Sequence, residues 1–288
     1  MQNKKQLEKD INLIGSFKGL AQAYEEISVT KMQRARGKVL ATRAFLDDLA
    51  QVFADVKSSY SDEISQLGEK KKGIFSFSTG NKNGKTIAVL ISSNNKLYGD
   101  IGKKVFRFFM EDVRQNKADI YIIGKVGREL YDQVTYKKAY QYIDFPEGEE
   151  SKKILEGVLK VMEQYQTVLV YYGQFVNVIT QNPVKANVSG TKKLEEVEEN
   201  KKHVKFFFEP SVESVLTVFE NQIFGSLFRQ TLHESELSHV TSRIQQMEYA
   251  LQNIEISQKK LTKTKKLVMK RQESAKRLQR LSGASLWK

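Results

Sequence analysis

Apolar side chains near the start of the chain recur at alternating steps of three and four residues, the spacing of one helix face. The stripe has two parts, with a shift near residues 28–32. The first part is Leu7, Ile11, Ile14, Phe17, Leu20, Tyr24 and Ile27, and the second is Met32, Ala35, Val39, Thr42, Leu46, Leu49, Phe53, Val56 and Tyr60. We predict one long helix with a stutter-like break at the shift, which would locally change a supercoil.

A similar stripe follows near the other end of the chain. Its members are Leu237, Val240, Ile244, Met247, Leu251, Ile254, Gln258 and Leu261. Farther on, Lys265 and Gln272 occupy core positions, while Val268 and Ala275 keep the register. Both stripes are narrow, close to the seam of a coiled coil rather than the broader face of a bundle helix. We therefore predict two long terminal helices that pair with each other in antiparallel orientation.

The three prolines, at positions 146, 183 and 210, all lie in the middle of the chain. Proline interrupts helices, so the two ends are free to form long unbroken ones. At 1.5 Å per residue the first helix would be about 85 Å long, too long for a compact domain. The predicted organisation is a coiled-coil helix over 1–62, a globular domain over 70–209 and a second coiled-coil helix over 210–288.

The middle of the chain alternates short β-rich apolar runs with helical patterns, which indicates an α/β domain with a partly parallel, Rossmann-like sheet. The predicted strands are Thr86–Ser92, Ala118–Ile123, Val168–Val178 and His203–Glu209, with Gly73–Ser78 as a further candidate. The predicted helices are Ile101–Asn116 and Lys152–Gln166. The charged stretch Ser189–Lys202 is predicted to be a solvated loop.

The net charge of +13 is concentrated at the end of the chain. Residues 259–288 contain eleven Lys or Arg and one acid, Glu273, a net charge of +10. A local field of this size favours an anionic partner, which could be nucleic acid, lipid headgroups or an acidic protein surface. Cysteine is absent, which excludes disulfides and thiolate metal sites. No apolar run reaches the roughly 18 residues that span a bilayer.

Two glycine-containing segments approach nucleotide-binding motifs without matching them. Gly80–Thr86 is one residue shorter than a phosphate-binding loop, and a predicted strand follows it where that chemistry needs a helix N-terminus. Gly124–Gly127 lacks the leading glycine of a dinucleotide fingerprint. We interpret the first as a hairpin turn and the second as a strand-to-helix turn, and we predict no cofactor.

His233, Glu234, Glu236 and His239 cluster in the last helix. Residues six apart on a helix face different ways, so they cannot close a metal site together. We predict a solvated helix face here and no metal. With three histidines and no cysteine, no nucleophile–base arrangement can be nominated, so we predict no catalytic residues.

Five stretches, in order, resemble the gamma subunit of rotary F-type ATP synthases. They are Thr30–Arg36 (TKMQRAR, against S-K-L-R-R-A-Q), Ile91–Gly99 (ISSNNKLYG, against T-S-D-R-G-L-C-G), Ala118–Arg128 (ADIYIIGKVGR, against A-D-L-V-V-I-G-R-K-G-R), Pro210-Ser211 with Glu220–Phe224 (ENQIF, against E-N-Q-I-Y), and Leu281–Leu286 (LSGASL, against V-G-G-A-A-A-L). The resemblance covers nearly the whole chain and is weakest from about 130 to 205.

The resemblance implies a non-catalytic rotor shaft that turns inside a hexamer of alpha and beta subunits. It further implies a peripheral place on the cytoplasmic face of the cell membrane, with an epsilon-like subunit and a membrane ring, or a replacement for them, as other partners. A basic helix end would meet acidic loops of the hexamer, and the last apolar residues would sit in an apolar collar. The expected contact residues are Lys31, Arg34, Arg36, Glu220, Asn221, Gln222, Lys259, Lys263, Lys266, Lys270, Arg271, Arg277, Leu286 and Trp287.

Departures from the family pattern leave alternatives open. Gly19, Gln22 and Glu25 occupy positions where the family has lysines, and of its E-H-A-A-R element only Glu234 is in place. One alternative is the rotor of an F-type-like ATPase of wall-less bacteria that only hydrolyses ATP. Another is a basic coiled-coil protein that binds nucleic acid or anionic membrane. Residues 259–286 contain no aromatic side chain for base stacking, so we expect no nucleic-acid partner.

Overall fold

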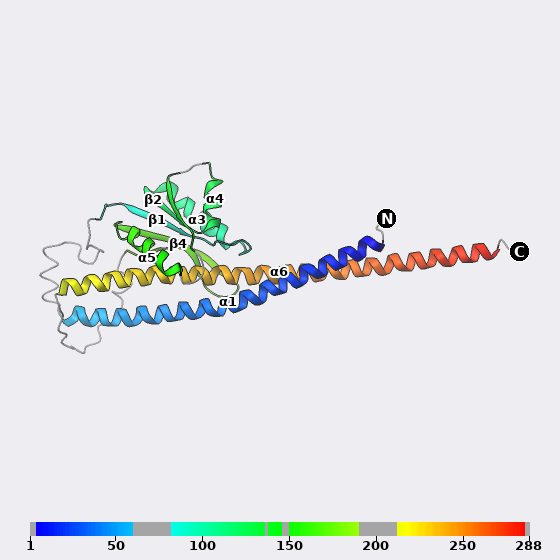
Figure 1. Ribbon diagram of the computed structural model, residues 1–288, viewed down its shortest axis with the longest axis horizontal. Helices are drawn as coiled ribbons and strands as arrows, with labels where there is room; N and C mark the ends of the chain where they lie inside the picture. The colour runs from blue at the N-terminus through cyan, green and yellow to red at the C-terminus, as the bar shows by residue number, and fades with distance from the viewer. Residues whose placement is uncertain (1–3, 60–81, 136–137, 146–149, 190–211, 286–288) are drawn as a thin grey trace. The chain divides into compact units, whose positions relative to one another are not determined.

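The computed structural model describes residues 4–59, 82–135, 138–145, 150–189 and 212–285 (Figure 1). Its two long helices are α1 (Lys4–Ser59) and α6 (Val212–Ser285), as the apolar stripes predict. The chain forms two compact units, and both helices contribute to each. The coiled-coil unit comprises Met1–Thr30 and Arg243–Lys288, and the sheet unit comprises Lys31–Ser242.

In the coiled-coil unit, the first half of α1 packs against the second half of α6. Ion pairs join Glu8 to Lys265 at 3.1 Å and Lys18 to Glu255 at 3.2 Å. The residue number on α6 falls as the number on α1 rises, so the two helices are antiparallel, as predicted. Leu7 is fully buried in this unit, and the Arg243 guanidinium lies 6.0 Å from the centre of the Tyr24 ring.

The predicted shift of the seam in α1 is wrong. The buried or half-buried positions keep one regular heptad, which passes through small and polar residues where the apolar stripe does not. Its members are Leu7, Ile11, Ile14, Lys18, Ala21, Glu25 and Ser28, followed in the sheet unit by Met32, Ala35, Val39, Thr42, Leu46, Leu49 and Phe53. Phe17, Leu20 and Ile27, predicted in the seam, are 51–55% exposed. Small side chains such as those of Ala21, Ser28 and Ala35 allow a close helix–helix approach, so that face is the buried one.

The described part of the sheet unit contains a five-stranded sheet with strand order β3-β2-β1-β4-β5. Its strands are β1 (Thr86–Ile91), β2 (Ala118–Ile123), β3 (Tyr140–Ile143), β4 (Thr167–Phe175) and β5 (Gln181–Asn187). The first four strands pair in parallel, and β5 is antiparallel to β4. The predicted α/β class and the partly parallel sheet are therefore confirmed.

Two strands were not predicted from the sequence. β3 is only four residues long, and β5 contains Pro183, which the antiparallel edge of a sheet tolerates. The predicted strand Val168–Val178 ends three residues early, at Phe175, because the chain turns back there into β5. The predicted strands Gly73–Ser78 and His203–Glu209 and most of the loop Ser189–Lys202 lie outside the described residues.

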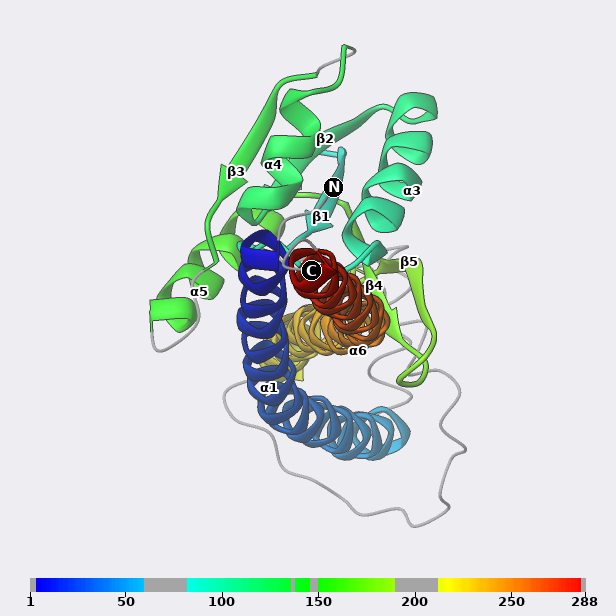
Figure 2. The same cartoon turned by 90° about the vertical axis from the view of Figure 1, so that its right-hand side faces the viewer.

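Helices cover both faces of the sheet (Figure 2). Ala88 and Leu90 of β1 face α3 (Ile101–Gln115) and α4 (Lys125–Asp132), where they join one apolar cluster. Their neighbours Ile87 and Val89 face α5 (Glu150–Met162) and the first part of α6 in a second cluster. This alternation along a strand that is buried on both sides explains why TIAVLI reads as a continuous apolar run.

Candidate partner-contact surface and helix–sheet junction

The strand order of the sheet reverses between β1 and β4, the place where open α/β sheets usually bind ligands beyond the carboxyl ends of their strands. Here α6 packs against that end of β4. A Cβ added to Gly173 would lie 2.7 Å from the Ser238 hydroxyl oxygen and 3.0 Å from a side-chain carbon of Ile101. The centres of the Tyr98 and His239 rings lie 5.6 Å apart. The region is therefore packed with protein, and glycine at 173 allows the close approach.

A buried carboxylate connects α1, α6 and β4 in the sheet unit. The Glu234 side chain is 3% exposed and accepts hydrogen bonds from Arg43 Nη2 at 2.7 Å, Gln230 Nε2 at 3.1 Å and the Tyr172 hydroxyl at 3.3 Å. Burial, followed by the neighbouring Glu234 charge, raises the pKa of the Tyr172 hydroxyl, which therefore stays protonated and donates. We call Arg43, Tyr172, Gln230 and Glu234 the helix–sheet junction.

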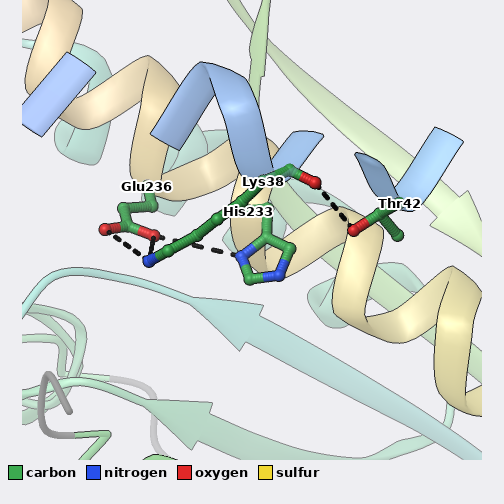
Figure 3. Close-up of polar contacts among 4 residues, drawn as sticks. All are labelled: Lys38, Thr42, His233 and Glu236. Carbon is green, nitrogen blue, oxygen red and sulfur yellow. Dashed lines mark hydrogen bonds and ion pairs between the residues drawn. The ribbon is translucent and has the colours of Figure 1, made fainter. Parts of the chain in front are cut away.

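A second and more exposed polar group joins Lys38 and Thr42 of α1 to His233 and Glu236 of α6, and Figure 3 shows its contacts. Lys38 Nζ of α1 bonds both carboxylate oxygens of Glu236, at 3.1 and 3.4 Å, and the Thr42 hydroxyl donates to the Lys38 carbonyl at 2.8 Å. His233 Nδ1 lies 4.0 Å from the same carboxylate. Burial, then the positive charges of Lys38 and Arg229, lower the pKa of His233 to about 4. His233 is therefore neutral at pH 7.

The predicted solvated face at 233–239 is wrong. Glu234 and His239 are buried, because this part of α6 lies between α1 on one side and the sheet on the other. Charges that the sequence assigns to solvent thus become internal contacts of the sheet unit. Within the described residues, no group of three or more His, Cys, Asp or Glu side chains is arranged to hold a metal ion.

Each of the two glycine-containing segments has a glycine with a positive φ in its described part. Gly84 has a positive φ of 67° in the turn before β1, where Lys85 N donates to Asn83 Oδ1 at 2.9 Å. A strand follows, so no helix N-terminus points at this loop. Gly124 (φ 97°) forms the turn from β2 into α4, as predicted, and a Cβ there would lie 2.4 Å from the Ser92 carbonyl oxygen. The hairpin partner expected for the first turn lies outside the described residues.

The expected contact residues occupy different environments. Lys31 is half-buried, Arg34 and Arg36 are exposed, and Glu220 is buried beside the exposed Asn221 and Gln222. The six basic contact residues predicted near the end of α6 are exposed: Lys259, Lys263, Lys266, Lys270, Arg271 and Arg277. From Arg271 to Ser282 every residue is exposed. Leu286 and Trp287 lie outside the described residues.

A surface that the sequence analysis missed runs along α1 in the coiled-coil unit. Leu13, Phe17, Leu20 and Ile27 repeat at helical spacing and are 51–55% exposed. Their periodicity was visible in the sequence, but it indicated the seam rather than a second face. We call these four residues the outer apolar stripe. No helix in the described part of the chain has the length and apolar character needed to cross a membrane.

The sequence and the fold are both similar to known proteins. A family profile described as ATP synthase matches residues 3–274. The ATP synthase gamma chain of Pelotomaculum thermopropionicum is 26% identical over 265 residues, 88% of each chain, and that of Mycoplasma mycoides subsp. mycoides SC is 23% identical over 258 residues, again 88% of each. The fold matches a chain in the rotor of Euglena gracilis mitochondrial ATP synthase, with a TM-score of 0.61 and 16% identity over 93% of this chain and 98% of that one. A chain from the central stalk and c-ring of Tetrahymena thermophila mitochondrial ATP synthase matches with a TM-score of 0.56 and 18% identity over 80% of this chain and 99% of that one.

Proposed function

The chain belongs to the ATP synthase gamma chain family, and from this premise we propose that α1 and α6 turn inside a hexamer of alpha and beta subunits. It is a central-stalk subunit and not the catalytic one. In this role it couples ATP hydrolysis or synthesis to rotation. At each rotational position it contacts the three catalytic sites differently, and these unequal contacts hold equivalent sites in different states. The observation that carries the proposal is the antiparallel packing of α1 on α6 with a fully exposed basic segment beyond it.

The basic end of α6 is the proposed contact with the hexamer. Six of its cations, at positions 259, 263, 266, 270, 271 and 277, are exposed. A dense positive field on a single helix favours acidic loops on the surrounding subunits, and exposed charge pairs tolerate rotation because they need no fixed geometry. Leu286 and Trp287 are proposed to enter an apolar collar. Lys31, Arg34, Arg36, Glu220, Asn221 and Gln222 are proposed to make the contacts nearer the sheet.

The helix–sheet junction has a mechanical role in this proposal. Torque on the paired helices has to reach the sheet, and a buried carboxylate bonded to α1 and β4 resists sliding of α6 between them. We propose that residues 70–209 act as the load-bearing domain and that 1–62 and 210–288 act as the shaft. This division by role differs from the division by compactness, in which both helices contribute to both units.

The test is assembly with purified alpha and beta subunits. Replacing Lys259, Lys263 and Lys266 together by Glu should weaken assembly and lower the rotation-coupled ATPase rate, because the acidic loops would meet like charge. Replacing the same three residues by Arg keeps the charge and is the matched control, expected to assemble normally. Normal assembly of the Glu variant would overturn the proposed contact.

The membrane-side partners are also proposed. The solved relatives come from a rotor, a central stalk with c-ring, and an F1 with c-ring. We propose that this chain joins an epsilon-like subunit and a membrane ring, or a replacement for the ring, on the cytoplasmic face of the membrane, and that it binds no nucleic acid. Pull-down from detergent-solubilised membranes with the full chain tests this, and recovery of hexamer subunits without any membrane subunit would argue for a replacement.

The altered charges of α1 favour a second candidate function. Gly19 and Gln22 are exposed and Glu25 is half-buried, at positions where the family has lysines. A shaft with these changes fits a hexamer that has changed with it, as in an F-type-like ATPase that only hydrolyses ATP. Inverted membrane vesicles separate the two candidates. ATP-driven acidification supports the proton-coupled enzyme, whereas ATP hydrolysis without acidification supports the specialised one.

A further inference from the structure

A groove lies along α3 in the sheet unit, and none of its lining residues belongs to the shaft contacts proposed above. Its volume is about 340 Å³. Phe106 and Met110 of α3 and Val134, which follows α4, supply its apolar lining. Met110 is buried, while Phe106 and Val134 are half-buried, so the apolar surface is recessed rather than projecting.

Three cations surround this apolar lining. Lys103 and Arg107, one turn apart on α3, and Arg114, two turns farther along, are exposed members of the groove. Within the described residues, none of the three lies within ion-pair distance of a carboxylate. Two other charges of the same helix form ion pairs within the chain: Lys104 with Asp100 at 2.8 Å and Asp112 with Lys185 at 3.1 Å. The groove also contains the carboxylate of Glu111, so its three cations leave it with an excess of positive charge.

The shape and the charges together narrow the class of partner. Binding to a membrane surface requires apolar side chains that project from the protein. Phe106 and Met110 are recessed, which argues against a membrane partner. A nucleic-acid backbone favours a long uninterrupted basic track, and here the exposed carboxylate of Glu111 lies within the groove. A pocket near the lower end of the usual range of about 300–1,000 Å³, and open to solvent, accommodates one large side chain of a protein better than a whole cofactor.

We propose that the α3 groove binds an acidic amphipathic segment of a partner protein. One apolar side chain of the segment enters between Phe106, Met110 and Val134. Carboxylates on either side of it meet Arg107 and Arg114, whose planar guanidinium groups form paired hydrogen bonds with carboxylates. The site is built on a rigid element, because Val105 and Phe109 anchor the opposite side of α3 in the core.

The test uses the full chain and a defined probe. The probe is a fluorescein-labelled helical 15-residue peptide with Leu at every third or fourth position and Glu elsewhere. The comparison peptide has Lys in place of Glu. The test variant is Arg107→Glu with Arg114→Glu, which changes only exposed side chains. The matched control is Lys153→Glu with Lys160→Glu on exposed positions of α5, across the sheet from α3.

We expect the acidic peptide to bind the unmodified chain with an affinity that falls as the salt concentration rises. Its affinity for the α3 variant should be at least about tenfold lower, and its affinity for the α5 variant should be unchanged. Methyl NMR signals of Met110 and Val134 should shift on binding, which locates the peptide in the groove. Circular dichroism checks that both variants are folded. Hexamer assembly should be unchanged in the α3 variant, which separates this inference from the proposed shaft function.

Three results would overturn the proposal. The first is absence of binding by the acidic peptide, or equal binding to both variants. The second is equal affinity for the lysine peptide, since charge would then play no part. The third is a binding affinity that depends on Arg107 and Arg114 for phospholipid vesicles or for a DNA oligonucleotide but not for the acidic peptide. That result would assign the groove to a membrane, if the probe is a vesicle of neutral and anionic phospholipid, or to a nucleic acid, if it is the oligonucleotide.

Discussion

At the scale of single residues, the contrast between Glu234 and Glu236 is the most informative. Both lie on α6 and both pair with a cation of α1, but the Glu234 side chain is 3% exposed and the Glu236 side chain 36%. A buried carboxylate depends on every donor around it, whereas an exposed ion pair contributes little because water replaces the lost partner. The two pairs, two residues apart on α6, therefore form a natural comparison.

Replacing Arg43 by Ala should lower the free energy of unfolding by about 1–3 kcal/mol, because the Glu234 charge keeps only Gln230 and Tyr172 as donors. Replacing Lys38 by Ala is the control and should cost about 0–1 kcal/mol. Urea unfolding measures both. A double-mutant cycle with Glu234→Ala then isolates the coupling of Arg43 to Glu234. Equal losses in the Lys38 and Arg43 variants would contradict the importance of the buried pair.

His233 should make stability depend on pH in mild acid. Its pKa in the folded chain is about 4, against an ordinary value of 6.5, so folding favours the neutral ring. The contribution is fully present above pH 6.5 and is lost as the pH falls toward 4, where the unfolded chain binds the proton and the folded chain does not. The loss is at most about 3 kcal/mol.

The measurement is an NMR titration of the three histidine rings, with His233→Gln to assign the signal. The same variant should flatten the fall in unfolding free energy between pH 6.5 and 4. Burial, followed by the charges of Lys38 and Arg229, holds the pKa of His233 down, so Lys38→Met should raise that pKa part of the way toward its ordinary value. A His233 signal that titrates near 6.5 in the unmodified chain would contradict the assignment.

At the scale of elements, α1 carries two apolar patterns in its first thirty residues, and only one of them is buried. The buried seam contains Ala21 and Ser28, while the outer apolar stripe contains Leu13, Phe17, Leu20 and Ile27. An exposed stripe on a helix that is already paired is typical of a surface that meets another protein. The proposed hexamer is the partner that fits it within the proposed function.

Replacing Phe17 and Leu20 together by Ser should change the stability of the isolated chain by no more than about 0.5 kcal/mol for each substitution, because both side chains are half exposed. Replacing the buried Leu7 by Ala should cost about 2 kcal/mol or more. In assembly with alpha and beta subunits, the Ser variant should be weaker than the unmodified chain. Thermal unfolding followed by helix circular dichroism, together with gel filtration of the complex, measures the two effects. Undiminished assembly would exclude the stripe as a contact.

At the scale of the whole molecule, charge and burial are divided between the ends and the sheet unit. Residues 259–288 carry +10 of the +13 net charge, while the sheet unit contains both large apolar clusters. A highly charged and largely exposed helix end contributes little to stability and much to association. The fold and the contact with partners are therefore separable by truncation.

Removing residues 271–288 should leave the unfolding free energy of the sheet unit within about 0.5 kcal/mol, because the removed side chains from Arg271 to Ser282 are all exposed. The same truncation should weaken assembly with the hexamer. The assembly of the truncated chain should also depend less on salt concentration than that of the full chain. Urea unfolding and assembly at low and high salt are the two measurements. A truncated chain that assembles with unchanged salt dependence would show that residues 271–288 are not a contact.

The amino-acid sequence by itself determined the two long helices, two central strands of the sheet and the family. Periods of three and four residues predicted α1 and α6, continuous apolar runs predicted β1 and β2, and the colinear motifs predicted the family. These features are local, since each depends on which residues share a helix face or a strand. β3 and β5 escaped prediction because short and polar edge strands take their structure from the neighbours with which they pair.

Only the tertiary structure decided which face of the first part of α1 is buried and that the side chain of Glu234 on α6 is enclosed. The sequence placed Phe17, Leu20 and Ile27 in the seam and Glu234 in solvent, and both assignments were reversed. A periodic pattern defines a face but not the partner that covers it. Close helix packing selected the face with Ala21 and Ser28, and the position of α6 between α1 and β4 enclosed Glu234 together with its donors. Burial depends on contacts between distant parts of the chain, which periodicity along one helix does not contain.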